Sequence, residues 1–132
     1  MLAAALAGVP DAIVHLIESN GKKAAFLREA VKVATCPAVV HHMRIEHFLD
    51  GFAGSVDAVT ARALAPLKTL MDQSVKLISR GAVGVFPKGR NATAELAETV
   101  KHWNLKHSLV SSRTDPSGNI LVIHNAESRR RK

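Results

Sequence analysis

Short apolar runs alternate with helix-like segments along this chain, and this alternation restricts the fold more than any other feature. Short, almost continuously apolar runs are typical of strands that are buried on both faces of a parallel sheet. The pattern predicts such strands at residues 13–17, 38–41, 56–60 and 82–86. Because helix-like segments separate most of these strands, we expect an α/β fold with a mostly parallel sheet and helices on both faces.

Capping and breaking residues delimit the predicted helices. The predicted starts are Ser19 or Asn20, Pro66 and Asn91, and the predicted ends are Pro37, Gly81 and Trp103. Residues 1–8 (MLAAALAG) read like the last two turns of a longer helix, because no capping residue precedes them. Two last strands, near residues 105–111 and 119–124, flank the turn sequence DPSG. This turn predicts an antiparallel hairpin at the end of the sheet.

Composition limits the class of protein. With 132 residues and 47% apolar residues, the chain suffices for one domain and is too apolar to be wholly disordered. Its longest apolar run, residues 1–9, is far shorter than the roughly 18 residues of a membrane-spanning helix. The single cysteine, Cys36, cannot form an intrachain disulfide, which fits a reducing cytosol. The net charge of +7 allows a nucleic-acid partner, although four basic residues at 129–132 supply over half of it.

Ligands of open α/β sheets bind at the carboxyl ends of the strands, so residues at these ends are the candidate site residues. Glu18 ends the first predicted strand, where a carboxylate can accept hydrogen bonds from both ribose hydroxyls of a nucleoside. A carboxylate favoured by the dipole of the next helix is an equally good explanation. After the second strand, Ile45 could pack on a purine ring and Glu46 could bind its amino group, although a solvated loop also explains both residues.

Three cations follow the third and fourth predicted strands. Arg62 comes directly after the third strand, where a guanidinium can bind a carboxylate or a phosphate with two hydrogen bonds. Lys88 and Arg90 flank a glycine after the fourth strand and are candidates for contacts with phosphate groups. An arginine that caps a sheet edge and a simple surface turn remain as alternatives.

Two common kinds of site find no support in the sequence. Neither GxGxxG nor GxxxxGK[ST] occurs, which argues against an intact dinucleotide site and against a P-loop NTPase. His41, His42 and His47 lie close together, but no cysteine or carboxylate falls at the usual zinc-ligand spacing. We therefore expect no metal site, and we identify no pair of residues for acid–base or nucleophilic catalysis.

Four short motifs follow one another at suitable spacing: HLIESNGKKAAFLR at residues 15–28, RIE at 44–46, VTARALAPL at 59–67 and FPKGR at 86–90. Together they resemble the motifs of the small-subunit ribosomal RNA methyltransferase G family, also called glucose-inhibited division protein B. SRTDP at 112–116 with ILVI at 120–123 resembles the C-terminal hairpin of that family. The resemblance covers nearly the whole chain apart from its tail, and four ordered motifs are far more specific than one.

The resemblance implies a Rossmann-like, S-adenosylmethionine-dependent enzyme that methylates N7 of a guanine in 16S ribosomal RNA. By the family pattern, Glu18 would lie by the cofactor ribose, and Ile45 and Glu46 would lie by the adenine. Arg62 would contact the cofactor or the RNA. Lys88 and Arg90 would face the RNA.

The resemblance also predicts a departure from the family. Family members begin with a helical extension, a first strand and a glycine-rich loop, and none of these occurs in the sequence. The first strand is central in the family's sheet, between the strand that ends at Glu18 and the strand before Arg62. We therefore expect a truncated copy that binds S-adenosylmethionine poorly or not at all, because two strands would lose their partner. The alternatives are a non-catalytic RNA-binding remnant and a nicotinamide dehydrogenase domain, which would need the missing glycine-rich loop.

In domain terms, we predict a partial methyltransferase domain at residues 1–125 and a disordered basic tail at 126–132. We expect a cytoplasmic monomer that binds 16S ribosomal RNA and needs neither a metal nor a membrane.

Overall fold

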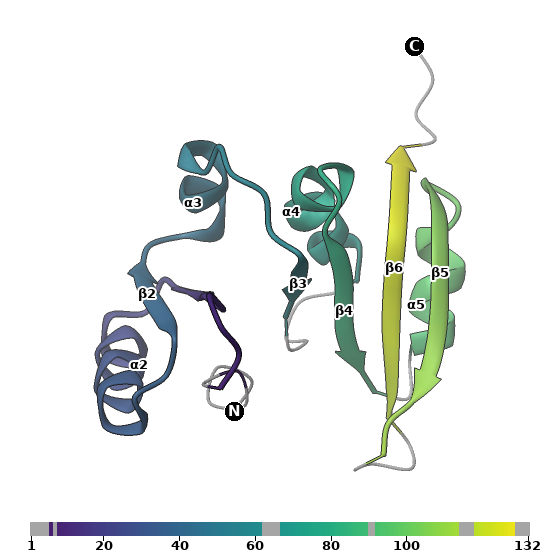
Figure 1. Cartoon of the computed structure of the whole chain (residues 1–132). Coiled ribbons are helices and arrows are strands. Elements are labelled where there is room, and N and C mark those ends of the chain that lie inside the picture. Colours follow the sequence, from purple (N-terminus) through teal and green to yellow (C-terminus); the bar gives the residue numbers. More distant parts are fainter. Residues whose placement is uncertain (1–5, 7, 62–66, 90–91, 114–117, 129–132) are drawn as a thin grey trace. The chain divides into compact units, whose positions relative to one another are not determined.

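A computed structural model of the chain describes residues 6, 8–61, 67–89, 92–113 and 118–128. It divides into two compact units, Met1–Ala53 and Gly54–Lys132, which we call unit 1 and unit 2. Each unit has its own sheet, of two and of four strands (Figure 1). We expected one partial domain whose sheet lacks its central strand. The described strands form two sheets, since no pairing links the strands of unit 1 to those of unit 2.

The sheet of unit 1 consists of β1 (Val14–Glu18) and β2 (Ala38–His42), which pair in parallel with Glu18 opposite His42. Helix α2 (Gly21–Ala34) connects the two strands. Asn20 caps this helix as predicted, because its side chain accepts a hydrogen bond from the Lys23 N–H at 3.0 Å. The helix ends at Thr35, before Pro37, in the left-handed conformation with φ 52°.

Helix α3 (Ile45–Gly51) was not among the predicted helices. The helix has seven residues, and its N-cap, Arg44, makes no side-chain capping bond, so local signals for it are weak. Tertiary packing stabilises this helix, since Phe48 and Leu49 are buried. The ring of Phe48 lies 4.8 Å from the ring of His41, centroid to centroid, on β2.

Unit 2 begins with β3 (Ala58–Thr60), α4 (Leu67–Ser79) and β4 (Val83–Lys88), and it continues with α5 (Ala92–Thr99), β5 (Trp103–Ser111) and β6 (Asn119–Ser128). The strand order is β3-β4-β6-β5. Among the described strands of this unit, only the β3–β4 pair is parallel, and the last two strands form the predicted antiparallel hairpin. The structure therefore confirms an α/β fold of parallel pairs that closes with antiparallel strands.

The core of unit 2 lies between α4 and the sheet. The apolar residues of α4, which recur at helical spacing, pack on β6, and the core cluster consists of Leu67, Leu70, Met71, Ile78, Phe86, Leu121, Ile123 and Ala126. Helix α5 also adds a side chain to this cluster. The core therefore fixes the two helices that follow β3 and β4, and with them the carboxyl ends of these strands.

Two predicted boundaries in unit 2 are wrong. The helix expected to run to Trp103 ends at Thr99, and Trp103 begins β5 and packs against the core. Strand β6 continues to Ser128, so residues 126–128 do not belong to a disordered tail. The β5–β6 pairing continues past a register shift at Lys106/His107 to Trp103 and Ser128, and Ala126 is buried. Residues 129–132 lie outside the described residues.

Among the described residues, β1 pairs only with β2, and β3 pairs only with β4. The expected lack of a central strand between β1 and β3 stays a prediction. No helix in the described ranges is long and apolar enough to cross a membrane.

Candidate functional site

Glu18 lies at the carboxyl end of β1, where the sequence placed it. Its Oε2 accepts a hydrogen bond from the Asn20 N–H at 3.1 Å, so the carboxylate orders the turn that leads into α2. Its Oε1 has no hydrogen-bond partner among the residues that the structure describes. The carboxylate can therefore hold its own loop and still accept a hydrogen bond from a ligand hydroxyl. This geometry agrees with both explanations that the sequence left open.

His42 ends the neighbouring strand β2, and the sequence analysis did not place it near the site. Its Nε2 lies 3.2 Å from the carbonyl oxygen of Ser19, in the turn after β1. A Cβ at Gly21 would lie 3.4 Å from Cε1 of His42, an ordinary van der Waals contact, so the imidazole lies directly against this turn. The parallel register that sets Glu18 opposite His42 brings this ring to the turn. Only the pairing of the two strands reveals that contact.

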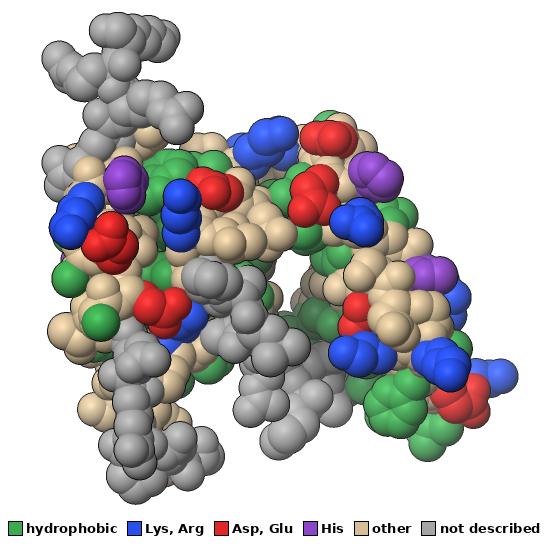
Figure 2. All heavy atoms as spheres, turned by 180° about the vertical axis from the view of Figure 1, so that it is seen from behind, with side chains coloured by type: hydrophobic (Ala, Val, Ile, Leu, Met, Phe, Trp, Pro, Cys, Tyr) green, Lys and Arg blue, Asp and Glu red, His purple; other side chains and the backbone are tan. Residues whose placement is uncertain are grey.

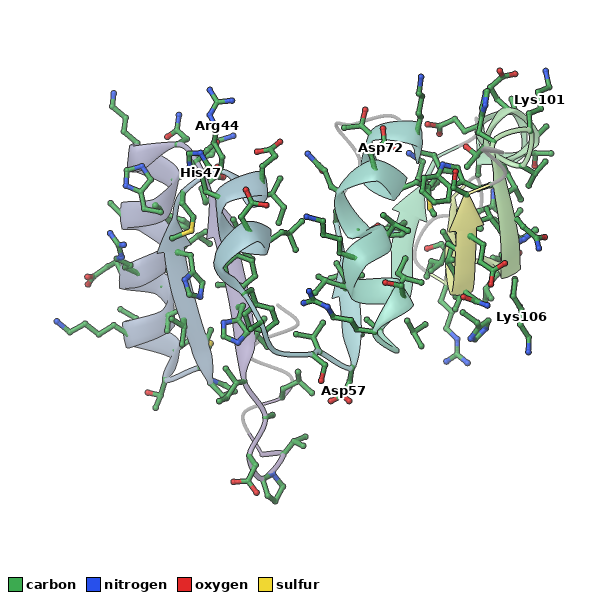
Figure 3. The ribbon with its side chains drawn as sticks, turned by 90° about the horizontal axis from the view of Figure 1, so that it is seen from above. Arg44, His47, Asp57, Asp72, Lys101 and Lys106 are labelled. Carbon is green, nitrogen blue, oxygen red and sulfur yellow. The ribbon has the colours of Figure 1, made fainter. Side chains whose placement is uncertain are left out.

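Ile45 and Glu46 form the first turn of α3, directly after β2. Ile45 is half-buried and Glu46 is exposed. A carboxylate in the first turn of a helix also interacts favourably with the helix dipole, so Glu46 has a structural reason to be acidic. Figure 3 shows Arg44 and His47 at this same end of α3. Because β1 and β2 are parallel neighbours, the residues that follow them occupy one edge of the sheet.

A cluster of rings holds α3 against the strands. His15 Nδ1 on β1 lies 3.0 Å from His41 Nε2 on β2, a hydrogen-bond distance. Phe48 lies beside both imidazoles, and its ring stacks on Phe52 at 5.0 Å, centroid to centroid. Burial lowers the pKa of His41, and the neighbouring His15 lowers it further. The cluster thus supports the helix that carries Ile45.

No metal centre is evident in the ranges that the structure describes. No group of three or more His, Cys, Asp or Glu side chains comes close enough there to hold an ion. His41 and His42 lie next to each other in β2, and the two side chains have different partners, His15 and the Ser19 carbonyl.

Arg62 and Arg90 lie outside the described residues. The strands that precede them are described: β3 ends at Thr60 and β4 ends at Lys88. The predicted roles of both arginines therefore stay predictions.

A lysine that contacts RNA must face solvent, and Lys88 does not. Only 4% of its side chain is exposed, and its Nζ lies 3.2 Å from Oε1 of Glu95 on α5. The same oxygen of Glu95 accepts a hydrogen bond from the Leu67 N–H at 3.0 Å. The sequence analysis missed Glu95. A Glu on α5, seven residues after a basic residue, gives no local sign of such a contact.

Acidic and basic side chains are interspersed on the side of the molecule that Figure 2 displays. Six of the 18 Lys and Arg residues, at positions 62, 90 and 129–132, lie outside the described residues. On the displayed side, charge therefore does not mark out a nucleic-acid surface.

The arrangement of strands and helices is that of a Rossmann-like methyltransferase. An rRNA methylase from Streptococcus thermophilus superposes with a TM-score of 0.64 over 92% of this chain and 78% of that protein, at 11% identity. The cofactor-bound protein Rv0187 from MTB also reaches a TM-score of 0.64, over 89% of this chain and 64% of that protein, at 18% identity. At such identities the likeness establishes the fold alone.

The sequence comparisons identify the family. The model of the GidB family, rRNA small subunit methyltransferase G, matches residues 3–121. The ribosomal RNA small subunit methyltransferase G of Nitrobacter hamburgensis is 46% identical over 99% of this chain, and that of a Bradyrhizobium species (strain BTAi1) is 48% identical over 93%. The chain belongs to the rRNA small subunit methyltransferase G family. It spans about half the length of the curated relatives it matches, 50% and 55% of these two.

Proposed function

We propose that this chain belongs to an enzyme that methylates N7 of a guanine in 16S ribosomal RNA, with S-adenosylmethionine as methyl donor. Family membership supports the reaction class, since residues 3–121 match the family model. The observation that carries the cofactor proposal is the set of residues that follow β1 and β2. Glu18, Ile45 and Glu46 occupy one edge of a parallel pair.

Glu18 fits a nucleoside ligand. Its Oε2 is used within the turn, and its Oε1 remains an acceptor for a ribose hydroxyl. A hydrogen bond to an ionised carboxylate is stronger than one between neutral groups. Ile45, half-buried at the start of α3, offers an apolar surface for a purine ring, and Glu46 offers an acceptor for an amino group. We propose Arg62 as a further cofactor or RNA contact and Arg90 as an RNA contact.

S-adenosylmethionine supplies a methyl group on a sulfonium when it is bound. Guanine N7 carries an unprotonated lone pair, so the attack needs no general base from the protein. The protein must align N7 with the methyl group and exclude competing water, and it must tolerate the positive charge that N7 acquires. A site without a catalytic dyad is therefore suited to this reaction.

A second candidate function is RNA binding without methyl transfer. The observation that favours it is the net charge of +7, to which the basic residues at 129–132 contribute. The candidate predicts RNA affinity that falls steeply with salt and no measurable binding of S-adenosylmethionine.

Calorimetric titration of the chain with S-adenosylmethionine separates the two functions. Measurable binding that weakens about tenfold or more in Glu18→Gln supports the cofactor proposal, because a charge-assisted hydrogen bond is lost. Glu29→Gln, an exposed change on α2, is the matched control and should bind like the wild type. Absence of binding together with salt-sensitive binding of transcribed 16S ribosomal RNA would favour the second function. Equal binding by Glu18→Gln and Glu29→Gln would refute the role of Glu18.

The substrate also suggests where the protein acts. We propose the cytoplasm, because 16S ribosomal RNA is made and processed there. We further propose that the chain acts as a monomer, and sedimentation of the purified chain tests this.

A further inference from the structure

Lys88 is a buried cation that the proposed function does not use. Lysine is almost never buried unless its charge is paired, because removing an ammonium group from water is costly. With 4% of its side chain exposed, Lys88 meets this condition through Glu95 Oε1, 3.2 Å away. It lies at the last position of β4, in the FPKGR motif. Its burial at a strand end therefore calls for a local explanation.

The partner of Lys88 has a second contact. Oε1 of Glu95 also accepts the Leu67 N–H at 3.0 Å. Leu67 is the first described residue of α4, and the N–H groups in the first turn of a helix have no partner within the helix. A carboxylate there also interacts favourably with the positive end of the helix dipole. One carboxylate oxygen on α5 thus joins the end of β4 to the start of α4.

These two ends are the attachment points of the candidate ligand-binding residues. Arg62 precedes Leu67 by five positions in the sequence, and Arg90 follows Lys88 by two. A shift of the start of α4 or of the end of β4 would therefore displace the anchor of each segment. An error of about 1 Å in position is enough to reduce activity by roughly a hundredfold in enzymes that depend on alignment.

We infer that Glu95 is a positioning residue that fixes the start of α4 and the end of β4 through the Leu67 N–H and the Lys88 ammonium. Lys88 is then the internal counter-ion of Glu95 and does not contact RNA phosphates. The part of this inference that concerns RNA rests on the proposed function, and the part that concerns the buried pair does not.

Thermal denaturation tests the buried pair. Glu95→Gln should lower Tm by about 5 °C or more, because it leaves the buried Lys88 ammonium without its counter-charge. Lys88→Met should lower Tm less, because Glu95, with 28% of its side chain exposed, keeps part of its hydration. In the double variant Lys88→Met/Glu95→Gln, the loss in Tm should be clearly smaller than the sum of the two single losses.

The matched control is the exposed ion pair Glu98–Lys101. Its Oε2 and Nζ atoms are 3.0 Å apart, and both side chains are 66% exposed. Glu98→Gln and Lys101→Met should shift Tm by about 1 °C or less. Equal shifts for the two pairs would overturn the assignment of Lys88.

Salt dependence of RNA binding tests Lys88 directly. With transcribed 16S ribosomal RNA as the probe, Lys88→Met should leave the slope of log affinity against log salt unchanged. A lysine that neutralises a phosphate would lower this slope by about one, which would overturn the inference.

The positioning role needs a measurement on folded protein. At 10 °C, with folding checked by circular dichroism, Glu95→Leu should bind the RNA about tenfold more weakly than the wild type. Lys88→Met/Glu95→Gln keeps an acceptor for the Leu67 N–H without a buried charge and should restore affinity to within about threefold. A pair that only stabilises the fold would leave the affinity of folded Glu95→Leu unchanged, which would overturn the positioning role. If the wild type bound no RNA, the proposed function and the positioning role would fall together. The Tm values would then decide the buried pair alone.

Discussion

His41 is a single residue whose protonation is coupled to folding. Its pKa is lowered by burial and then by His15, so the folded chain favours the neutral imidazole. The unfolded chain therefore binds a proton at His41 more readily than the folded chain, and stability falls as the pH falls. We expect the loss to begin near the ordinary histidine value of about 6.5 and to continue down to the lowered pKa.

Melting of the chain at several pH values between 7 and 5 measures this effect. The variant His41→Phe keeps a ring beside Phe48 and removes the titration, so its melting temperature should depend less on pH than that of the wild type. A histidine pKa at or above 6.5 for His41, measured by NMR titration, would contradict the prediction.

Thr35 is a second residue whose environment predicts a measurable change. It ends α2 with φ 52°, a left-handed conformation that is unfavourable for a β-branched side chain. The capping contact is its backbone N–H to the Val31 carbonyl, which survives any substitution except proline. Thr35→Gly should therefore stabilise the chain by about 0.5–1 kcal/mol, measured by urea denaturation.

The same substitution at an ordinary helical position serves as the control. Thr69 is exposed within α4, and Thr69→Gly should destabilise the chain by about 0.5 kcal/mol because glycine is the weaker helix former. Changes of the same sign at both positions would argue against strain at Thr35.

At the scale of elements, close packing between β4 and α4 depends on a glycine. A Cβ at Gly84 would lie 2.8 Å from Cε2 of Phe86 and 3.2 Å from Cδ1 of Ile78. Phe86 is 1% exposed and belongs to the core, so its ring has little room to move. Gly84→Ala should therefore destabilise the chain by about 1–3 kcal/mol in urea denaturation. Gly51→Ala, at a position with nothing within 4 Å, is the control and should cost less than about 0.5 kcal/mol.

The elements also show the limits of local patterns. The stripe of α4 and the Asn20 cap of α2 follow from spacing and residue type, and both were predictable. Helix α3 was not, because seven residues without a side-chain cap form a helix only when Phe48 and Leu49 find a surface to cover. The end of β6 was misjudged for a similar reason, since Ala126 is buried by a strand pairing that its neighbours in sequence do not specify.

At the scale of the whole molecule, the two units differ in the size of their cores. Among the described residues, the buried apolar side chains number three in unit 1 and eleven in unit 2. Regions with few buried apolar contacts open at a lower free energy than the global unfolding reaction. Amides of β1 and β2 should therefore exchange with solvent deuterium faster than amides of β4 and β6 (Figure 1). Equal protection of the two sheets in native-state exchange would contradict this expectation.

At this scale, the sequence does not show which basic side chains reach solvent and could contact RNA. Lys88, Lys101 and Lys106 look alike as basic residues of one unit, and the structure gives them different surroundings. Figure 3 shows Lys101 and Lys106 at the outside of unit 2, whereas Lys88 is enclosed against Glu95. A formal charge contributes to a nucleic-acid surface only when it reaches solvent.

The sequence by itself determined the α/β fold, the family and the placement of Glu18 at a strand end, because strand periodicity, caps and ordered motifs depend on neighbouring residues. Tertiary structure decided which of these side chains are available to a ligand. Oε2 of Glu18 is bound within its own turn, while Lys88 is buried against Glu95, whose carboxylate also accepts a hydrogen bond from an amide 28 residues away in the sequence. Burial and pairing depend on contacts between distant segments, and no local pattern contains them.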